Sequence, residues 1–537
     1  MKKIYIIAAV VAVLAAGCQK EKTFSGMELV AEGFGGGTKA AVSGNASYWV
    51  AGETVNINGA AKTVQIEGNT AYVNDVTEAA QYRALYPASL NSSYDGSASS
   101  VSVAIPSSYQ WTVDGSGRQV LDVPMAAYGT GGDRLVFKHL TAAITVEITN
   151  HYGFPVIVDN VTVSSSASGT QYQLCGSKEI SLTSSDISVA ANASSSNTSV
   201  QVTFDGGTSL TIVQGATQRV QVPVLPVGSG NKFSISVTVH KEGNAAVTKT
   251  YTKTQTTGGA MARAKMAYAG DTVGFTFSVS ASKKVIISQG NLQYQASTNT
   301  WRFAEHQYDY VGNNSYGNVS VNEVKCNNAN VSSSYSGWID LFGWGTSGYN
   351  NGATCYQPYS TSTNASQYNP YGSTSYNLYD QTGQADWGYN AILNGGNTEN
   401  SGWHTLSDNE CLYVFSSRAN RCGRGNVSGV NGLVVLPDEW TLPSGVNFTP
   451  GSSNWANVYN TDQWALMEAN GAVFLPAAGY RENGQIGVCN EYLMYWTSTH
   501  YGSNAYYTRI SGTEFRPTYD NGGRECGLSV RLVRDVE

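Results

Sequence analysis

The sequence has few charged residues and no long apolar segment beyond its N-terminus. Charged side chains make up 13% of the 537 residues, against about a quarter in a typical globular protein. The net charge of −7 and the absence of a Lys/Arg run argue against nucleic acid as a partner. Gly (58) and Tyr (34) are abundant instead, as is typical of extracellular β-rich proteins. A chain of this length predicts about two to four domains.

The N-terminal segment has the layout of a secretory signal peptide. Two lysines precede an apolar run over 4–16, which is shorter than the roughly 20 residues that a bilayer-spanning helix needs. The alternative is a retained membrane-anchor helix. The small residues before Cys18 resemble the bacterial lipobox, which implies cleavage between Gly17 and Cys18 and lipidation of the Cys18 thiol. We therefore expect a signal peptide (1–17), a lipidated tether (18–30) and location at the outer membrane surface.

Apolar and polar residues then alternate with a period of two. This alternation occurs at 140–148, 220–224 and 233–240, and turns rich in Gly, Asn and Ser separate such segments. It predicts strands that bury one face and expose the other. Short strands at regular spacing favour β-sandwiches. Because the span is long for one sandwich, we expect two, over 31–149 and 150–280.

The composition changes near residue 281, where Trp, Tyr, Gly and Asn become more frequent and the alternation becomes irregular. Two short helices are predicted in this region. Ser407 and Glu410 form a capping-box pattern at the start of the first, and Thr461 is expected to cap the second. The sequence therefore predicts a loop-rich α+β domain over 281–537 after two mainly β domains.

Cysteine is scarce in the first half of the mature chain and concentrated in the last domain. An even number of cysteines in an exported segment predicts disulfides, and free buried thiols are the alternative. The six cysteines are Cys326, Cys355, Cys411, Cys422, Cys489 and Cys526. They contain no C-x-x-C, and no His stands in zinc-ligand register, so we expect neither a metal nor another cofactor. Cys175 is left over and is expected to be a small buried hydrophobe.

Three separated motifs in the first half resemble the fimbrillin family of Bacteroides-type bacteria. They occupy 48–57, 82–87 and 135–140, and the similarity covers about 30–278. It implies two transthyretin-like β-sandwiches, export as a lipoprotein, and assembly with other fimbrial subunits by strand exchange. An open sheet edge is a template for another chain's strand. The same residues also have a purely structural interpretation, as core and turn positions.

A proteolytic maturation site is also implied at Lys39, where related pilins often carry a basic residue. The surrounding Gly-rich stretch over 35–37 would make such a site accessible. Single basic residues in loops are common, so an ordinary loop lysine is the alternative. Cleavage at Lys39 would separate the working subunit from its lipid anchor.

The C-terminal region resembles the Bacteroidetes major paralogous domain, which is related to formylglycine-generating enzymes and more distantly to the C-type lectin fold. The motifs lie at 290–294, 301–304, 308–312, 341–345, 436–443, 474–481, 495–499 and 527–533. The resemblance implies that a late strand near 495–498 pairs with the final strand. It also suggests a Cys489–Cys526 disulfide, and Cys326–Cys355 and Cys411–Cys422 are further candidate pairs.

Catalytic patterns are missing from this region. Formylglycine-generating enzymes need reactive copper-binding cysteines, whereas Cys526 has no closely spaced partner. The Glu-Pro-Asn, Gln-Pro-Asp and Trp-Asn-Asp motifs of calcium-dependent lectins are absent. There is no Gly-x-Ser-x-Gly elbow in a strand–helix context. We therefore expect a protein that is not an enzyme.

Recognition is the alternative that the composition favours. A Tyr-, Asn-, Ser- and Gly-rich tract over 349–389 is predicted to be a binding loop, because exposed aromatic and amide groups bind sugar faces and protein surfaces. The candidate ligand-binding residues are Tyr349, Tyr356, Tyr359, Trp387 and Tyr389. An irregular surface without a ligand is the other interpretation of this tract.

Three functions follow as hypotheses. The first is a cell-surface fimbrial subunit, a tip or accessory adhesin with a ligand-binding head for a host or bacterial surface glycan or protein. The second is an outer-membrane lipoprotein receptor that captures glycan or protein without polymerising. The third is an enzyme on a formylglycine-generating-like fold.

Overall fold

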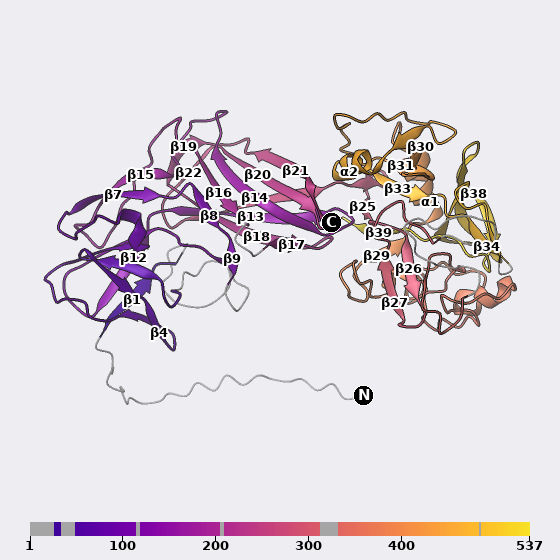
Figure 1. Cartoon of the computed structure of the whole chain (residues 1–537), viewed down its shortest axis with the longest axis horizontal. Coiled ribbons are helices and arrows are strands. Elements are labelled where there is room, and N and C mark those ends of the chain that lie inside the picture. The colour runs from indigo at the N-terminus through magenta and orange to yellow at the C-terminus, as the bar shows by residue number, and fades with distance from the viewer. Residues whose placement is uncertain are drawn as a thin grey trace.

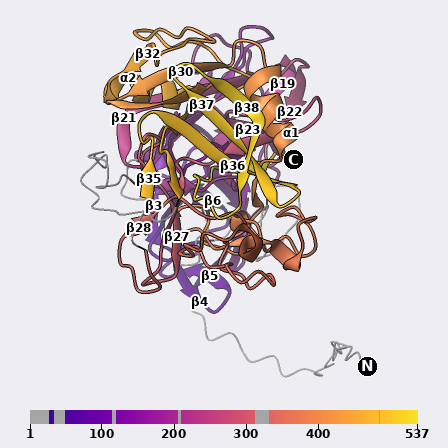
Figure 2. The same cartoon turned by 90° about the vertical axis from the view of Figure 1, so that its right-hand side faces the viewer.

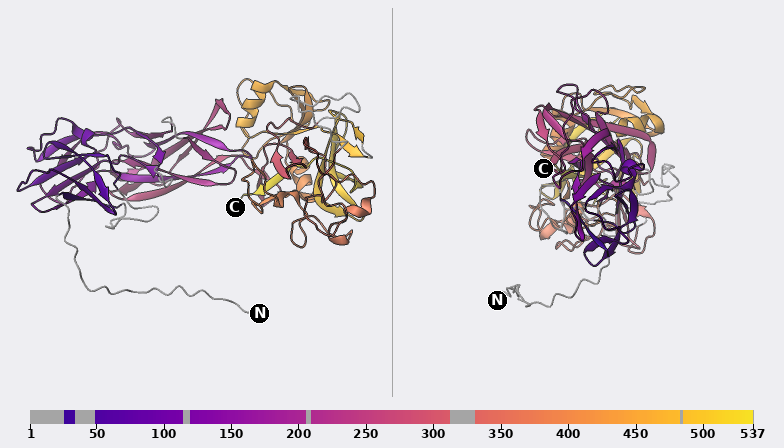
Figure 3. Two further views of the ribbon diagram at one scale, coloured as in Figure 1. Left: turned by 60° about the horizontal axis from the view of Figure 1, so that its bottom comes forward. Right: turned by 90° about the vertical axis from the view of Figure 1, so that its left-hand side faces the viewer.

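The computed structural model describes residues 26–33, 49–113, 119–204, 209–311, 331–482 and 485–536. The predicted sites Gly17, Cys18, Lys39 and Cys326 lie outside these residues. In the described ranges no helix is both long and apolar enough to cross a bilayer. The protein is mainly β, as predicted, and its sheets form three units along one elongated molecule (Figure 1, Figure 3).

The first unit is an eight-stranded sheet in the order β3-β2-β6-β11-β12-β1-β5-β4. Its strands are β1 (Met27–Ala31), β2 (Thr54–Ile57), β3 (Ala60–Thr63), β4 (Gln65–Glu67), β5 (Thr70–Val73), β6 (Tyr82–Tyr86), β11 (Met125–Gly129) and β12 (Arg134–His139). Side chains from both halves of the sheet meet in one core, so the sheet curls around it. Trp49 lies in this core, with its ring 4.9 Å from that of Tyr86 and 5.1 Å from that of Phe137.

Strand β1 begins inside the segment that was predicted to be a tether. Met27 and Leu29 are buried in the first core, while Glu28 and Val30 face the other way. This short alternation is a strand pattern. The predicted tether over 18–30 is therefore wrong at its C-terminal end.

The second unit is a β-sandwich. One sheet has the order β18-β13-β23 and the other β21-β20-β14-β16-β8, with β17 paired to β14. The strands are β8 (Ser108–Gln110), β13 (Ala142–His151), β14 (Val156–Ser165), β16 (Ser199–Thr203), β17 (Leu210–Ile212), β18 (Thr217–Val224), β20 (Phe233–Lys241), β21 (Asn244–Thr254) and β23 (Met266–Gly274). Strands β13 and β23 run parallel through nine paired positions, from Ala143↔Met266 to His151↔Gly274.

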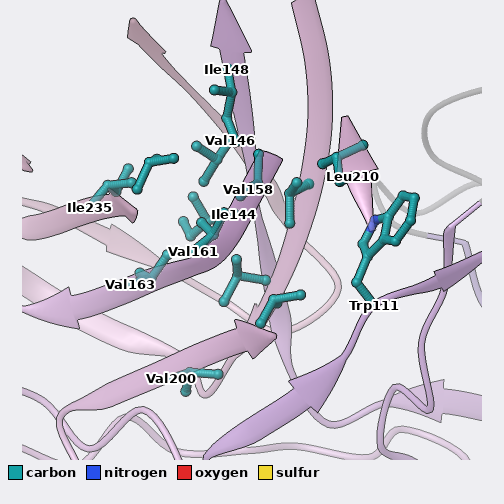
Figure 4. Packing of buried hydrophobic residues seen from close by; sticks show 14 of the residues in the cluster. Trp111, Ile144, Val146, Ile148, Val158, Val161, Val163, Val200, Leu210 and Ile235 are labelled. Atoms are coloured by element: carbon teal, nitrogen blue, oxygen red, sulfur yellow. The ribbon is translucent and has the colours of Figure 1, made fainter. Parts of the chain in front are cut away.

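The predicted period-two segments form the core of this sandwich. Ile144, Val146 and Ile148 of β13 face Val161 and Val163 of β14, and all five are essentially inaccessible to solvent (Figure 4). Each such side chain contributes about 1.5–3 kcal/mol by leaving water. The alternation of apolar and polar residues therefore gives each of these strands one apolar face, and these faces meet in the core.

The boundary predicted between 149 and 150 falls inside β13. In addition, β8 precedes β11 in sequence but pairs with β16 in the second unit. A small sheet of β7 (Ser100–Ile105) and β15 (Gly176–Ser181) also joins segments from either side of residue 150. The N-terminal part of the chain thus contributes strand β8 to the second unit, and the β7–β15 pair links the two parts, which periodicity alone does not reveal. The remaining small sheets are β9 (Thr112–Val113) with β10 (Gln119–Val120), and β19 (Val227–Asn231) with β22 (Gly259–Met261).

In the described residues, the third unit, which we call the head, contains several small sheets and two short α-helices. Its elements are β24 (Phe277–Ser278), β25 (Lys284–Ile287), β26 (Leu292–Gln295), β27 (Thr300–Phe303), β28 (Trp338–Ile339), β29 (Trp403–Thr405), α1 (Asp408–Leu412), β30 (Cys422–Val427), β31 (Val430–Val435), β32 (Asn457–Tyr459), α2 (Thr461–Ala469), β33 (Val473–Pro476), β34 (Tyr480–Glu482), β35 (Gln485–Gly487), β36 (Tyr492–Tyr501), β37 (Asn504–Ser511), β38 (Phe515–Gly523) and β39 (Leu532–Asp535).

Both predicted helices are present. Ser407 and Glu410 form the expected capping box at α1. The cap of α2 is Asn460, which pairs with Gln463 in a second capping box, so Thr461 is the first helical residue and not the cap. Asn is among the strongest N-cap residues.

The final strand β39 pairs with β25 and β29, close to the second unit (Figure 3). The predicted pairing of the late strand with the final segment is present as a single bridge between Tyr495 and Ser529. The head contacts the second unit through polar bonds. Lys241 binds both carboxylate oxygens of Glu468 at 3.0 Å, and the Tyr152 hydroxyl donates to the Ala469 carbonyl at 2.7 Å.

Candidate functional site

An aromatic cavity lies among strands of the head at the end of the molecule that is farthest from β1 (Figure 1). Its volume is about 390 Å³, which is in the range of ligand-binding pockets. It is lined by Tyr480, Glu482, Val488, Tyr492, Met494, Trp496, Tyr507, Arg509, Gly522, Cys526 and Leu528. Strands β34 and β38 lie at one end of the molecule and β1 lies toward the other (Figure 1), and strands β35 to β38 face the viewer in Figure 2.

Strand alternation explains how these side chains converge. Tyr492, Met494 and Trp496 are two residues apart on β36, so they share one face, while Leu493 and Tyr495 point into a core on the other face. On the neighbouring strand β37, Trp496 is paired with Tyr507 and Met494 with Arg509. The rings of Trp496 and Tyr507 meet edge to face at 5.9 Å. The hairpin β34–β35 supplies the facing wall, including Tyr480.

The polar groups of the cavity are suited to hydrogen bonding. Arg509 binds Asp520 through Nε at 2.7 Å and Glu514 through Nη2 at 3.1 Å, so its guanidinium is held in place. Burial, and next the Asp520 charge, raise the pKa of Tyr507, which keeps its hydroxyl neutral. Glu482 at the edge is exposed.

The Cys526 thiol at this cavity is poorly suited to act as a nucleophile. Burial, and next the Glu525 charge, raise the pKa of the Cys526 thiol to about 12. The thiol is therefore protonated at neutral pH, and a thiol is a much weaker nucleophile than a thiolate. Within the described ranges, no three His, Cys, Asp or Glu side chains come together as ligands for a metal ion.

The cysteine pairings suggested by the sequence are not formed among the described residues. Cys489 packs in the core beside α2, and its thiol donates to the Ala478 carbonyl, whereas Cys526 lies at the aromatic cavity in a different cluster. Cys411 and Cys422 share one core, but the Cys422 thiol donates to the Val414 carbonyl. The thiols of Cys411, Cys422, Cys526 and Cys355 form no disulfide among the described residues, and neither does the buried thiol of Cys175, which was expected to be unpaired. The Cys489–Cys526 and Cys411–Cys422 pairings are therefore wrong for this structure.

The tract over 349–389 is irregular, with short 3-10 turns and no strand, and it does not line the cavity. Tyr349 is exposed, and Tyr356, Tyr359 and Tyr389 are half-buried. Trp387 is wrong as a surface ligand contact, because it is fully buried and its indole N–H donates to the Thr346 carbonyl at 3.0 Å. An apolar ring of this size is stabilised by burial in the core.

Two buried arginines hold this tract against the rest of the head. Arg481 donates to the Ser360 carbonyl at 3.2 Å. Arg524, which is fully buried, donates to Asn369 Oδ1 and to the Thr374 carbonyl, both at 2.9 Å, and its guanidinium lies 4.5 Å from the Trp344 ring centre. Burial lowers the pKa of Arg524 to about 10, so it stays charged at neutral pH. These bonds thus fix the tract in place as part of the head surface.

A second structural site is the position of β1 in the first unit. Strand β1 pairs with β12 in parallel, from Glu28↔Arg134 to Ala31↔Phe137, and with β5 in antiparallel orientation. It is therefore an interior strand, although in sequence it is separated from the rest of the unit by residues 34–48. Sequence reasoning missed β1 because it is short and lies in a segment that was assigned to the tether.

No family model and no curated protein matches the chain. Several solved structures from Bacteroides species are similar to part of it. A protein from Bacteroides ovatus that is provisionally assigned to cell adhesion is 11% identical over 46% of this chain and 91% of its own, with a TM-score of 0.28. A protein with the same provisional assignment from Bacteroides uniformis is 15% identical over 46% and 93%, with a TM-score of 0.24. A fimbrial protein from Bacteroides vulgatus is 9% identical over 46% and 95%, with a TM-score of 0.21.

Proposed function

We propose that this chain is a cell-surface fimbrial subunit, a tip or accessory adhesin, whose β1 is replaced by a strand of a neighbouring subunit. The interior position of β1 between β12 and β5 is the observation that supports this proposal. Strand β1 lies within its sheet, but the chain connects it to the other strands only through residues 34–48. A single cut in that segment would therefore release it. Lys39 is the basic residue there.

Removal of β1 would leave a groove between β12 and β5 that can bind another strand. The backbone groups of β12 and β5 would lose their partners, and the core would lose the side chains of Met27 and Leu29. Unpaired strand edges bind extended segments through main-chain hydrogen bonds, and pockets for alternate side chains give specificity. A strand from a neighbouring subunit would satisfy both requirements.

The opposite end of the molecule would carry the adhesive function. The strands that line the aromatic cavity lie at the opposite end of the molecule from β1, so assembly at β1 would not cover them (Figure 1). Aromatic faces next to fixed hydrogen-bonding groups are suited to the rings of a surface glycan. Lipidation at Cys18 would carry the precursor to the outer membrane, and a cut at Lys39 would then release it from the anchor. We propose binding without catalysis, in keeping with the protonated Cys526 thiol.

Fimbriae sheared from cells test the assembly. We expect mass spectrometry to find this chain in the sheared polymers, starting at Ala40. A Lys39→Ala variant should remain as a lipidated monomer in the membrane fraction. Recovery of the unaltered chain only as a membrane monomer would instead favour the non-polymerising receptor.

Glycan arrays and cell binding with the full chain test the cavity. Tyr480→Ala and Tyr492→Ala remove partly exposed walls of the cavity and should abolish binding. Tyr501→Ala is the matched control, because Tyr501 is an exposed tyrosine on the same strand β36 and does not line the cavity. Equal loss of binding in all three variants would place the ligand elsewhere.

A further inference from the structure

A cluster of positive groups lies where β1 ends, at the junction between the first and second units. Glu32 follows β1 and continues its pairing, since its N–H donates to the Phe137 carbonyl at 2.9 Å. Its carboxylate lies 2.6 Å from Arg263 Nη1 and 3.4 Å from Lys138 Nζ, and it accepts the His139 N–H at 3.3 Å. We call Lys138, the His139 N–H and Arg263 the carboxylate socket.

The socket is built from elements that stay behind when β1 leaves. Lys138 and His139 belong to β12, and Arg263 lies in the second unit between β22 and β23. The side chains of Lys138, Arg263 and Glu32 are only 25%, 18% and 12% exposed. Among the described residues, the other carboxylate that pairs with Arg263 is that of Asp186, which is 89% exposed and 3.6 Å away. A charge at such an exposed position is screened by water and replaces Glu32 only weakly.

Release of β1 would therefore leave two partly buried cations without their main counter-ion. Removing one partner of a buried ion pair is strongly destabilising, because the other charge stays desolvated. The vacancy would select an incoming group that is anionic and accepts hydrogen bonds from a guanidinium and a backbone N–H. A carboxylate has this chemistry.

We propose that the carboxylate socket selects the strand that replaces β1 by requiring an Asp or Glu at the position of Glu32. The partner is then an extended segment of another subunit with two apolar residues in the places of Met27 and Leu29 and an acidic residue three positions after the second. This inference rests on the strand replacement proposed above and adds the partner's charge requirement to it. The apolar pair fills the core, and the carboxylate sets the register, because a shift by one residue would turn it away from the socket.

Peptide exchange on the full chain tests the requirement. The chain is cut at residue 39 by a site-specific protease and incubated with fluorescent peptides that carry the sequence of residues 26–33. One peptide is unaltered, one carries Glu32→Gln, and one carries Val30→Glu together with Glu32→Gln. The third is the matched control, because it has the same net charge as the first but carries the carboxylate two positions away on the same side of the strand.

We expect the unaltered peptide to bind about tenfold more tightly than either variant. The difference should shrink in Lys138→Met and Arg263→Met chains and in high salt, so one of these chains is sufficient if the other does not fold. Equal binding of all three peptides would overturn the socket and leave strand replacement standing. If no peptide enters the cut chain, strand replacement itself is refuted, and the socket with it.

Discussion

The buried guanidinium of Arg524 gives a sharp test of how the head surface is held. Besides Asn369 and Thr374, it donates to the carbonyls of Gly502 at 2.9 Å and Asn504 at 3.2 Å. Among the described residues, these four acceptors are all neutral, and no carboxylate forms a salt bridge with Arg524. The residue thus joins the tract near 369–374 to the β36–β37 turn through four acceptors.

An Arg524→Met variant would leave those acceptors without their donor. Each buried acceptor without a donor costs about 1–3 kcal/mol. Removal of the buried positive charge offsets part of the total cost for the four acceptors. We expect a net loss of about 3–5 kcal/mol in the free energy of unfolding of the head. The pKa of about 10 adds no pH dependence near neutrality, because the group is protonated in both states there.

Hydrogen exchange measured by mass spectrometry reports the loss locally. Peptides that cover 369–377 and 500–506 should lose roughly a hundredfold or more of their protection, since each 1.4 kcal/mol is about a factor of ten. Arg516→Met is the control, because Arg516 is half-exposed and its pairs with Asp520 and Glu514 lie at the surface. It should change stability by less than about 0.5 kcal/mol. Wild-type protection in Arg524→Met would refute the idea that this guanidinium holds the tract.

Three further outcomes follow. Burial lowers the pKa of His139 from its usual 6.5 to about 4, so between these pH values the imidazole is protonated in the unfolded chain but not in the folded one. The free energy of unfolding should therefore fall by about 3 kcal/mol as the pH drops from 6.5 to 4. Urea titrations should show a smaller fall for His139→Gln. Leu29→Ala should destabilise the first unit by about 2–4 kcal/mol by leaving a cavity beside β12, and a melting curve equal to that of Val30→Ala would contradict this. Glu468→Gln weakens the bond to Lys241 and should lower the stability of the contact between the second unit and the head by about 1–2 kcal/mol. Limited proteolysis should then cut faster between these two units. Unchanged cleavage would show that other contacts hold the junction.

Much of the second unit could be predicted from local pattern. The alternation at 140–148 and 233–240 gives β13 and β20, because a half-buried strand needs an apolar side chain at every second position. The sheet that each strand joins was not predictable, and so the boundary at 150 was misplaced within β13. Pairing depends on contacts between distant segments, such as β8 with β16.

The aromatic cavity could not be predicted either, because it also depends on which strands pair. Trp496 and Tyr507 are both conspicuous in the sequence, but only the pairing of β36 with β37 brings their rings together. Composition instead directed attention to the Tyr- and Asn-rich tract, where Trp387 proved to be buried. Abundance of aromatic residues does not tell a core ring from a binding ring, because both positions favour the same side chains. The charge cluster at Glu32 was equally hidden, since Arg263 lies 231 positions away in sequence.

The parallel pairing of β13 with β23 has a mechanical consequence. Strand β23 leads directly into the head, so tension applied to the head would be transmitted to this strand. Its nine paired positions with β13 would then be loaded in shear, and the hydrogen bonds must yield together instead of one after another. An attachment of this kind resists flow better than a strand that peels from its end. If the head binds a surface as proposed, force on it would therefore be resisted by all nine paired positions at once.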